Sequence, residues 1–121
     1  MFFRQQTPEQ IENFRRMLEV VGEIKAVCDA NDRDLYVIVF PNRIQVENRE
    51  DLSSASYDAE KPNRMILEYC ENIEVACLDL LPAMADAYER TREPLFYPVD
   101  RHPNEKGYRF AAEAIASFVE E

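Results

Sequence analysis

The chain has 121 residues and a formal net charge of −10, with 46% hydrophobic and 31% charged residues. This length suits one domain with its own core, and the lack of a long apolar run excludes a membrane-spanning helix. So acidic a surface repels nucleic-acid phosphates and anionic lipids, so we expect small-molecule, neutral or cationic partners. The first ten residues lack the features of a signal peptide, so we expect a cytoplasmic protein unless an upstream leader is missing.

The N-terminal third predicts one long amphipathic helix, from Thr7 to about Asn31. Thr7 can cap this helix, Pro8 suits its first position and Gln10 completes a capping box. Apolar residues then recur every three or four positions, which is the period of a helix with one buried face.

A strand is predicted next, at Leu35–Phe40, where the sequence reads LYVIVF. Six consecutive apolar residues indicate a strand buried on both faces, as in a parallel sheet. We expect Asn42–Asn48 to extend or bulge this strand, because apolar and polar residues alternate there. The polar, serine-containing stretch Arg49–Lys61 predicts a loop.

The second half of the chain again alternates helices with apolar segments. Helix-period stripes and proline positions mark the helices, and a continuous apolar run marks the second strand. The expected elements are a helix from Pro62 to about Ile73, a strand at Val75–Leu81, a helix at Pro82–Thr91, an edge strand or extended segment at Leu95–Tyr97, and a last helix from Pro103 or Asn104 to Val119.

This order predicts an α/β fold with a three-layer α/β/α, flavodoxin-like arrangement around a parallel sheet. Both strands look buried on both faces, yet a sheet of two strands would leave apolar edges open. We therefore expect an incomplete sheet. The chain would be a single α/β domain over residues 1–121 or the C-terminal part of one, completed by missing sequence or by a second copy in a homo-oligomer.

The sequence has few residues of the types that bind metals or cofactors. Cys28, Cys70 and Cys77 lie in apolar segments without tight spacing, which favours small buried side chains over a zinc site. Gly22 and Gly107 are the only glycines, so the sequence has no glycine-rich phosphate loop. We expect neither a metal ion nor a cofactor.

Catalytic chemistry is best supported in the segment Tyr97–Tyr108, where Asp100 and the only histidine, His102, precede the last helix. In an extended backbone the two side chains point to the same side. The carboxylate would then fix the imidazole tautomer and leave the other ring nitrogen as a general base. Asn104 can cap the helix that follows. The plainer alternative is a surface or capping histidine.

The run DRHPNEKGYRFAAEAI resembles the last conserved block of the SGNH (GDSL-type) ester hydrolases and their acetyltransferase-like relatives. The segments LYVIVFPNRIQVE and VACLDLLPAM are similar to strand regions of the same superfamily, so the resemblance spans Leu35 to the C-terminus. It implies hydrolysis or transfer of an acyl group on a small-molecule ester or O-acylated substrate. Asp100 would orient His102, and His102 would take the proton of an attacking serine hydroxyl.

Other parts of the superfamily's site have no counterpart. No Gly-Asp-Ser block occurs, Gly22 lies inside a predicted helix, and Asn42 follows a proline where the superfamily has a glycine. None of the available serines sits on a predicted strand-to-helix turn: Ser53, Ser54, Ser56 and Ser117. We therefore expect the Asp/His-bearing C-terminal part of such an enzyme, inactive as an isolated chain.

Two alternatives stay open from the sequence. The chain could be a non-catalytic SGNH-like binding or assembly module, or an unrelated small acidic α/β protein. Both SGNH-like readings place Asp100 and His102 within hydrogen-bond reach at the carboxyl edge of the sheet, where open α/β sheets have their sites. The unrelated protein would hold them apart.

Overall fold

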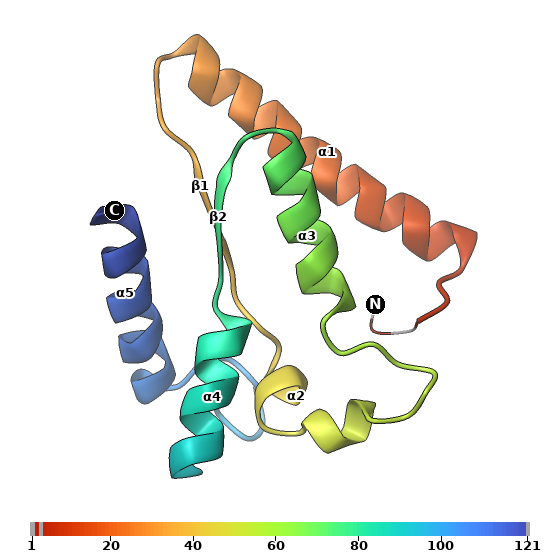
Figure 1. Cartoon of the computed structure of the whole chain (residues 1–121), viewed down its shortest axis with the longest axis vertical. Coiled ribbons are helices and arrows are strands. Elements are labelled where there is room, and N and C mark those ends of the chain that lie inside the picture. Colours follow the sequence, from red (N-terminus) through yellow and green to blue (C-terminus); the bar gives the residue numbers. More distant parts are fainter. Residues whose placement is uncertain (1, 3, 121) are drawn as a thin grey trace.

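The computed structural model describes Phe2 and residues 4–120. Figure 1 shows the two strands running between α1 and α3 on one side and α5 on the other, which makes three layers. None of the described helices combines the length and apolar character that crossing a membrane requires. In chain order the elements are α1 (Pro8–Ala30), β1 (Tyr36–Val39), α2 (Arg43–Val46), the 3₁₀ turn η1 (Arg49–Leu52), α3 (Lys61–Asn72), β2 (Ala76–Asp79), α4 (Leu81–Thr91) and α5 (Glu105–Glu120).

The sheet consists of β1 and β2 in the described part of the chain, and the two strands are parallel as predicted. Tyr36 lies opposite Ala76 at one end, and Val39 lies opposite Asp79 at the other. Apart from the buried Val39, the strand residues are exposed or half-buried, so the prediction of burial on both faces was wrong in this chain. Among the residues that the structure describes, each strand pairs with one other strand, so its outer edge has no strand beside it. The fold is thus α/β with a small sheet.

The helix starts follow the local signals in the sequence. Thr7 and Gln10 form the expected capping box at the start of α1. Pro62 lies in the first turn of α3, where a missing backbone N–H costs nothing. Helix α4 begins at Leu81, one residue before the predicted start. Each of these helices therefore begins within about a turn of its predicted position.

Residues 42–48 correct the prediction of an extended or bulged strand. They contain the short helix α2 (Arg43–Val46), because Asn42 and Gln45 make a second capping box after Pro41. The Asn42 N–H donates to the Gln45 side-chain oxygen at 2.7 Å, and the Ile44 N–H donates to the Asn42 side chain at 3.2 Å. The polar alternation that suggested a strand therefore belongs to one capped helical turn.

The predicted polar loop at Arg49–Lys61 begins with η1 and is otherwise mostly irregular. Leu52 within it is buried. The backbone N–H of Arg4 donates to the Ser56 carbonyl at 2.8 Å, which ties the N-terminal segment to this loop. The loop is thus attached to the rest of the fold through the buried side chain of Leu52 and through the hydrogen bond between Arg4 and Ser56.

The main hydrophobic core lies where α2, α4 and the start of α5 meet. Met84 is fully buried and Phe96 is 2% exposed, so this region is closed to solvent. The packing places the segment before α5 directly on the core. The buried members of the cluster are Val46, Leu80, Leu81, Met84, Ala85, Leu95, Phe96 and Ala111.

Candidate active site

The segment that carries Asp100 and His102 folds back on itself before α5. Phe96 and Pro103 form an isolated antiparallel bridge, and the Tyr97 N–H donates to the His102 carbonyl at 2.8 Å. The predicted edge strand at Leu95–Tyr97 therefore pairs within its own loop and adds no strand to the sheet. This closed loop sets the position of the acidic and imidazole side chains.

Asp100 and His102 are close, but by a different route from the one predicted. Arg101 between them has φ +66°, in the left-handed region, so the backbone here is not extended. The Asp100 carboxylate oxygen accepts the His102 backbone N–H at 2.9 Å, and His102 Nδ1 lies 3.5 Å from the same oxygen. The tight turn thus brings the two side chains together, and both remain largely exposed, at 61% and 74%.

The buried carboxylate of Glu47, the C-cap residue of α2, holds this loop in place. Glu47 Oε1 accepts the backbone N–H groups of Leu95 at 2.7 Å and Phe96 at 3.1 Å, and its side chain is 6% exposed. Arg43 donates its Nε to the other carboxylate oxygen at 3.0 Å, and its Nη1 donates to the Pro98 carbonyl at 3.4 Å. Sequence reasoning missed Glu47, because nothing local marks a carboxylate whose partners lie 48 residues away.

The start of α5 closes the other end of the loop. Asn104 caps α5 as predicted, since its side-chain oxygen accepts the Gly107 N–H at 2.9 Å. The Asn104 amide also donates to the Pro94 carbonyl at 2.9 Å. At Gly107 a Cβ would lie 2.1 Å from the Leu95 carbonyl oxygen, so only glycine fits there. The loop is therefore clamped by α2 on one side and by α5 on the other.

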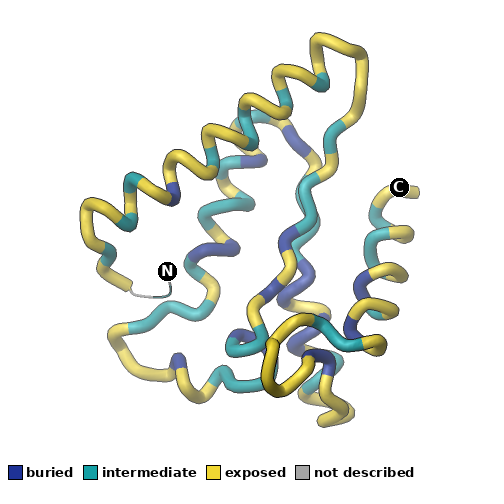
Figure 2. Tube along the Cα trace, turned by 180° about the vertical axis from the view of Figure 1, so that it is seen from behind, coloured by how far each residue is buried: buried dark blue, intermediate teal, exposed yellow. Residues whose placement is uncertain are grey.

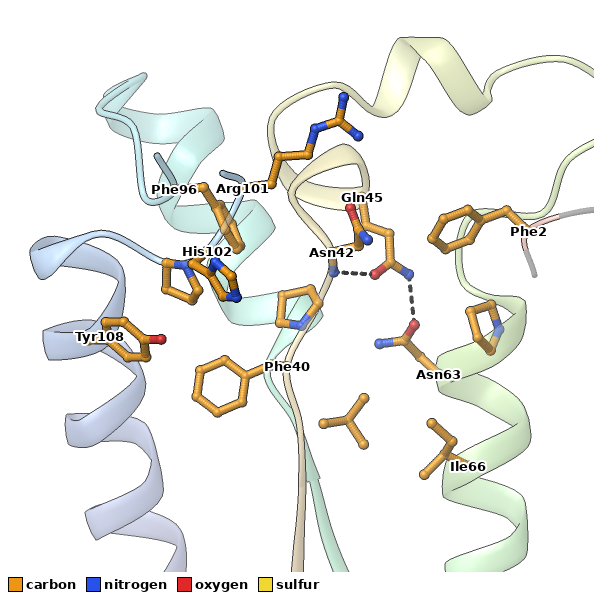
Figure 3. A pocket seen from close by; sticks show the side chains of 14 residues that line it. Phe2, Phe40, Asn42, Gln45, Asn63, Ile66, Phe96, Arg101, His102 and Tyr108 are labelled. Atoms are coloured by element: carbon orange, nitrogen blue, oxygen red, sulfur yellow. Dashed lines mark hydrogen bonds between the residues drawn. The ribbon is translucent and has the colours of Figure 1, made fainter. Parts of the chain in front are cut away.

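Beside His102 lies a cavity of about 470 Å³ at the carboxyl end of β1. Figure 3 shows His102, Phe40 and Tyr108 on one side of it and Asn63 and Ile66 on the other. This is the edge of the sheet where α/β proteins place their ligands. The residues that line it are Phe2, Val39, Phe40, Pro41, Asn42, Gln45, Pro62, Asn63, Ile66, Phe96, Arg101, His102, Pro103 and Tyr108.

A chain of buried polar side chains joins the elements around the cavity. The Gln45 amide donates to the Asn63 side-chain oxygen at 2.7 Å and to the Ala59 carbonyl at 2.6 Å. Asn63 in turn donates to Asp79 Oδ1 at 2.9 Å, and the same oxygen accepts the Leu81 N–H at 3.0 Å. Gln45 and Asn63 are 3% and 4% exposed. This network fixes the ends of β1 and β2 relative to α3.

No serine is among the residues that line the cavity. Ser53 is committed to the polar loop, where its hydroxyl donates to the Glu50 carbonyl at 2.7 Å. Asn42, which the sequence could not match to the superfamily's pattern, does line the cavity and caps α2. The structure thus brings Asp100, His102 and Asn42 to one area. No serine that could act as the nucleophile lines the cavity there.

The environment of Cys77 does not favour nucleophilic chemistry. Burial, together with the neighbouring Cys70 thiol and Asp79 carboxylate, raises the pKa of Cys77 to about 12. A thiol that stays protonated at neutral pH is a poor nucleophile. Within Phe2 and residues 4–120, no three histidine, cysteine or carboxylate side chains gather as a metal site would require.

The whole chain, residues 1–121, matches a family described as the SGNH hydrolase-like domain of acetyltransferase AlgX. The match confirms the resemblance that the last block suggested. It also extends over the N-terminal third of the chain, which that resemblance did not cover. No curated protein and no solved structure matches the chain.

Proposed function

We propose that this chain, which belongs to the family of SGNH hydrolase-like domains of acetyltransferase AlgX, supplies the acid–base half of a site for ester hydrolysis or O-acyl transfer. His102 is the general base that accepts the proton of an attacking hydroxyl and returns it to the leaving group. Asp100 orients the imidazole and stabilises its charged form. The substrate is a small-molecule ester or an O-acylated compound.

One observation carries the proposal: His102 lines the cavity while Asp100 lies on its Nδ1 side. The 3.5 Å between Nδ1 and the carboxylate oxygen is longer than a good hydrogen bond. Such distances are common in unliganded sites and shorten when substrate binds. With Nδ1 turned to Asp100, Nε2 is the nitrogen left to exchange a proton with substrate.

The nucleophile is outside the cavity lining of this chain. A serine hydroxyl has to reach the cavity from a residue that does not line it here. The proposal therefore assigns two of the three roles of a Ser-His-Asp site, base and orienting acid, to Asp100 and His102. A second candidate function follows from the same lack of a lining serine: an SGNH-like module that binds its ligand in this cavity without turnover.

The orienting role of Asp100 is tested by the tautomer of His102. Because the chain has one histidine, a ¹⁵N spectrum of the imidazole reports this site alone. We expect the neutral ring to carry its proton mainly on Nδ1, and Asp100→Asn to shift the population towards Nε2–H. The matched control is Asp32→Asn, at an exposed turn residue of positive φ. Equal tautomer populations in the wild type and Asp100→Asn would contradict the assignment.

An assay with a short-chain ester tests whether the isolated chain holds a complete site. We expect no turnover by the isolated chain, because no lining residue is a serine. Turnover that His102→Ala abolishes would show that the chain holds a complete site. Turnover that survives His102→Ala would contradict the role of His102 as general base.

A further inference from the structure

We infer that Cys70 of α3 and Cys77 of β2 are a modification site, where a disulfide forms under oxidising conditions and joins α3 to the sheet. Both cysteines carry free thiols in this structure. Neither lines the cavity beside His102, and the inference does not depend on the proposed function.

The strand β2 turns Cys77 towards α3. Side chains along a strand point alternately to the two faces of a sheet. Asp79 is on the α3 face, because its carboxylate accepts a hydrogen bond from Asn63 of α3 at 2.9 Å. Leu78 points the other way and packs against the core around α4. Cys77, two residues before Asp79, therefore shares the face that α3 covers.

The helix α3 turns Cys70 towards β2. Asn63 and Cys70 are seven residues apart, which is about two helical turns, so both lie on the same face of α3. Cys70 is 1% exposed, as expected for a side chain between a helix and a sheet. Side chains of a helix also lean towards its N-terminus, which is the direction in which β2 runs past α3.

The connection between the two elements keeps the cysteines close. The chain turns at Glu74, which has φ +59°, directly after α3. The Val75 N–H then donates to the carbonyl of Cys70 at 2.8 Å. Figure 1 shows the short loop that leads from α3 into β2. The end of α3 and the start of β2 are therefore fixed against each other, with Cys77 only two residues beyond this hydrogen bond.

The protonation of Cys77 agrees with this arrangement of the thiols. Burial is the main reason why its pKa is raised to about 12, and the charge of Cys70 and a hydrogen bond with its thiol come next. The carboxylate of Asp79 adds a smaller contribution. The two sulfur atoms are thus near neighbours, as the faces of α3 and β2 require.

The bond would form by exchange with a small disulfide, such as oxidised glutathione. Cys77 is the more accessible thiol, so its thiolate attacks one glutathione sulfur, breaks the glutathione S–S bond and releases the first glutathione. Cys70 then attacks the Cys77 sulfur of this mixed disulfide and releases the second glutathione. The two released molecules take up the two thiol protons, so one disulfide is reduced for each disulfide formed.

The disulfide would act as a structural cross-link. The raised pKa of Cys77 makes its attack slow at neutral pH, because only the thiolate reacts, and a rapid redox sensor needs the opposite. Hydrogen bonds of Asn63 with Gln45 and Asp79 already hold the N-terminal end of α3. A bond at Cys70 would hold the C-terminal end in addition.

Equilibration with glutathione tests the pairing in the wild-type chain. The reduced, folded chain is incubated with oxidised and reduced glutathione at about pH 8.5, near the pKa of a free thiol. We expect the intact mass to fall by two hydrogens, with one of the three thiols left for alkylation. Peptide mapping should join Cys70 to Cys77. Three remaining thiols, a persistent mixed disulfide with glutathione, or a bond that includes Cys28 would each overturn the inference.

Single variants assign the two partners independently of the mapping. Cys28→Ala is the matched control, because Cys28 is also a partly exposed free thiol, and this variant should still form the internal disulfide. Cys70→Ala and Cys77→Ala should both lose it. Circular dichroism shows whether each variant is folded, and the wild-type mapping decides the pairing if one is not. An internal disulfide that persists in either variant would overturn the inference.

The stability of the oxidised chain tests whether the fold holds the two sulfurs at bonding distance. Closing the loop of eight residues from Cys70 to Cys77 should lower the equilibrium constant of unfolding by roughly fiftyfold. Urea denaturation of the oxidised and the reduced chain measures this change, and Cys28→Ala should show the same difference. An oxidised chain no more stable than the reduced one would overturn the inference, because a bond that forces α3 away from β2 stores strain.

Discussion

Helix α1 and the region of α4 and α5 differ in how tightly they are packed. On the side of α4 and α5, Met84 and Phe96 are buried in one continuous core, and the loop with His102 lies on it. In α1, Phe14 is the only buried residue among 23, whereas α3 beside it buries Pro62, Asn63 and Cys70. Figure 2 shows that α1 is mostly exposed along the trace, whereas buried positions occur on α3, along the strands and around α4.

The exposure of the apolar residues of α1 increases this difference in packing. Ile11, Val20, Ile24 and Val27 are each between 46% and 63% exposed. A helix contributes to stability mainly through the face it buries, so α1 is held by few contacts. The loop that carries Asp100 and His102, in contrast, is held by hydrogen bonds to Glu47 on one side and from Asn104 on the other. Rigid support of this kind would hold the geometry of the pair that we propose as base and orienting acid.

The two glycines provide the strongest test of this contrast. Gly107→Ala should destabilise the chain by about 3 kcal/mol, because its Cβ would press on the backbone of Leu95, which cannot rotate away. Gly22→Ala in α1 meets only the hydroxyl end of Tyr69, at 2.6 Å, and that side chain can turn aside. Alanine also favours the helix by about 0.5–1 kcal/mol. Urea denaturation of both variants measures the difference, and equal losses would contradict uneven packing.

The next largest effect is expected at Glu47. Glu47→Ala should cost about 2 kcal/mol, because two buried backbone N–H groups and the Arg43 guanidinium lose their acceptor. Amide exchange at Leu95 and Phe96 should speed up by more than the global loss of stability explains. The comparison is Glu23→Ala on the exposed face of α1, which should change stability by less than about 0.5 kcal/mol.

Glu47→Gln refines that prediction. Glutamine keeps an oxygen for the two N–H groups but sets an amide N–H₂ against Arg43. We expect a loss smaller than that of alanine, with the exchange rates at Leu95 and Phe96 close to wild type. If glutamine and alanine are equally damaging, the charge pair with Arg43 matters more than the hold on the loop.

The smallest effect is expected on the α1 and α3 side, at the surface pair of Asp58 and Arg64. The hydrogen bond from Arg64, at 2.7 Å, lowers the pKa of Asp58 below its usual value of 3.8. This stabilisation is therefore complete well above pH 3.8 and is lost as the pH falls through the lowered pKa. Asp58→Asn should cost about 0.5 kcal/mol at pH 7, since the pair is partly exposed.

Denaturation of Asp58→Asn and the wild type at neutral and at strongly acidic pH measures that effect. The difference between the two should vanish in acid, where both side chains are neutral. A difference that stays constant with pH would show that Asp58 acts through shape or hydrogen bonding, not through its charge.

Much of the fold follows from signals that are local in the chain. The capping box of Thr7 and Gln10 and the cap at Asn104 lie where the sequence predicts them. The parallel pairing of the two strands also follows, since a helix connects two apolar runs. The error at residues 42–48 has a local cause as well. The alternation of polar residues there has the period of a strand, but the capping side chains favour a helical turn.

The proximity of Asp100 and His102 was predictable from the sequence, but the turn that produces it was not. Asp100 and His102 stand out as a pair in the sequence, and the structure places them 3.5 Å apart. The turn at Arg101 that brings them together was not predictable, because a positive φ at arginine has no sequence signal. Glu47 and Asn63 were missed for another reason, since their partners lie far along the chain.

The amino-acid order alone thus specifies where the long helices start, which runs form parallel strands, and that Asp100 and His102 share one block. Those features depend on neighbours within a few residues, so they can be read along the chain. The cavity beside His102, the hold of Glu47 on its loop and the uneven packing of the two sides arise only when distant segments meet. Burial and hydrogen bonding between such segments depend on the folded arrangement, and no local pattern encodes them.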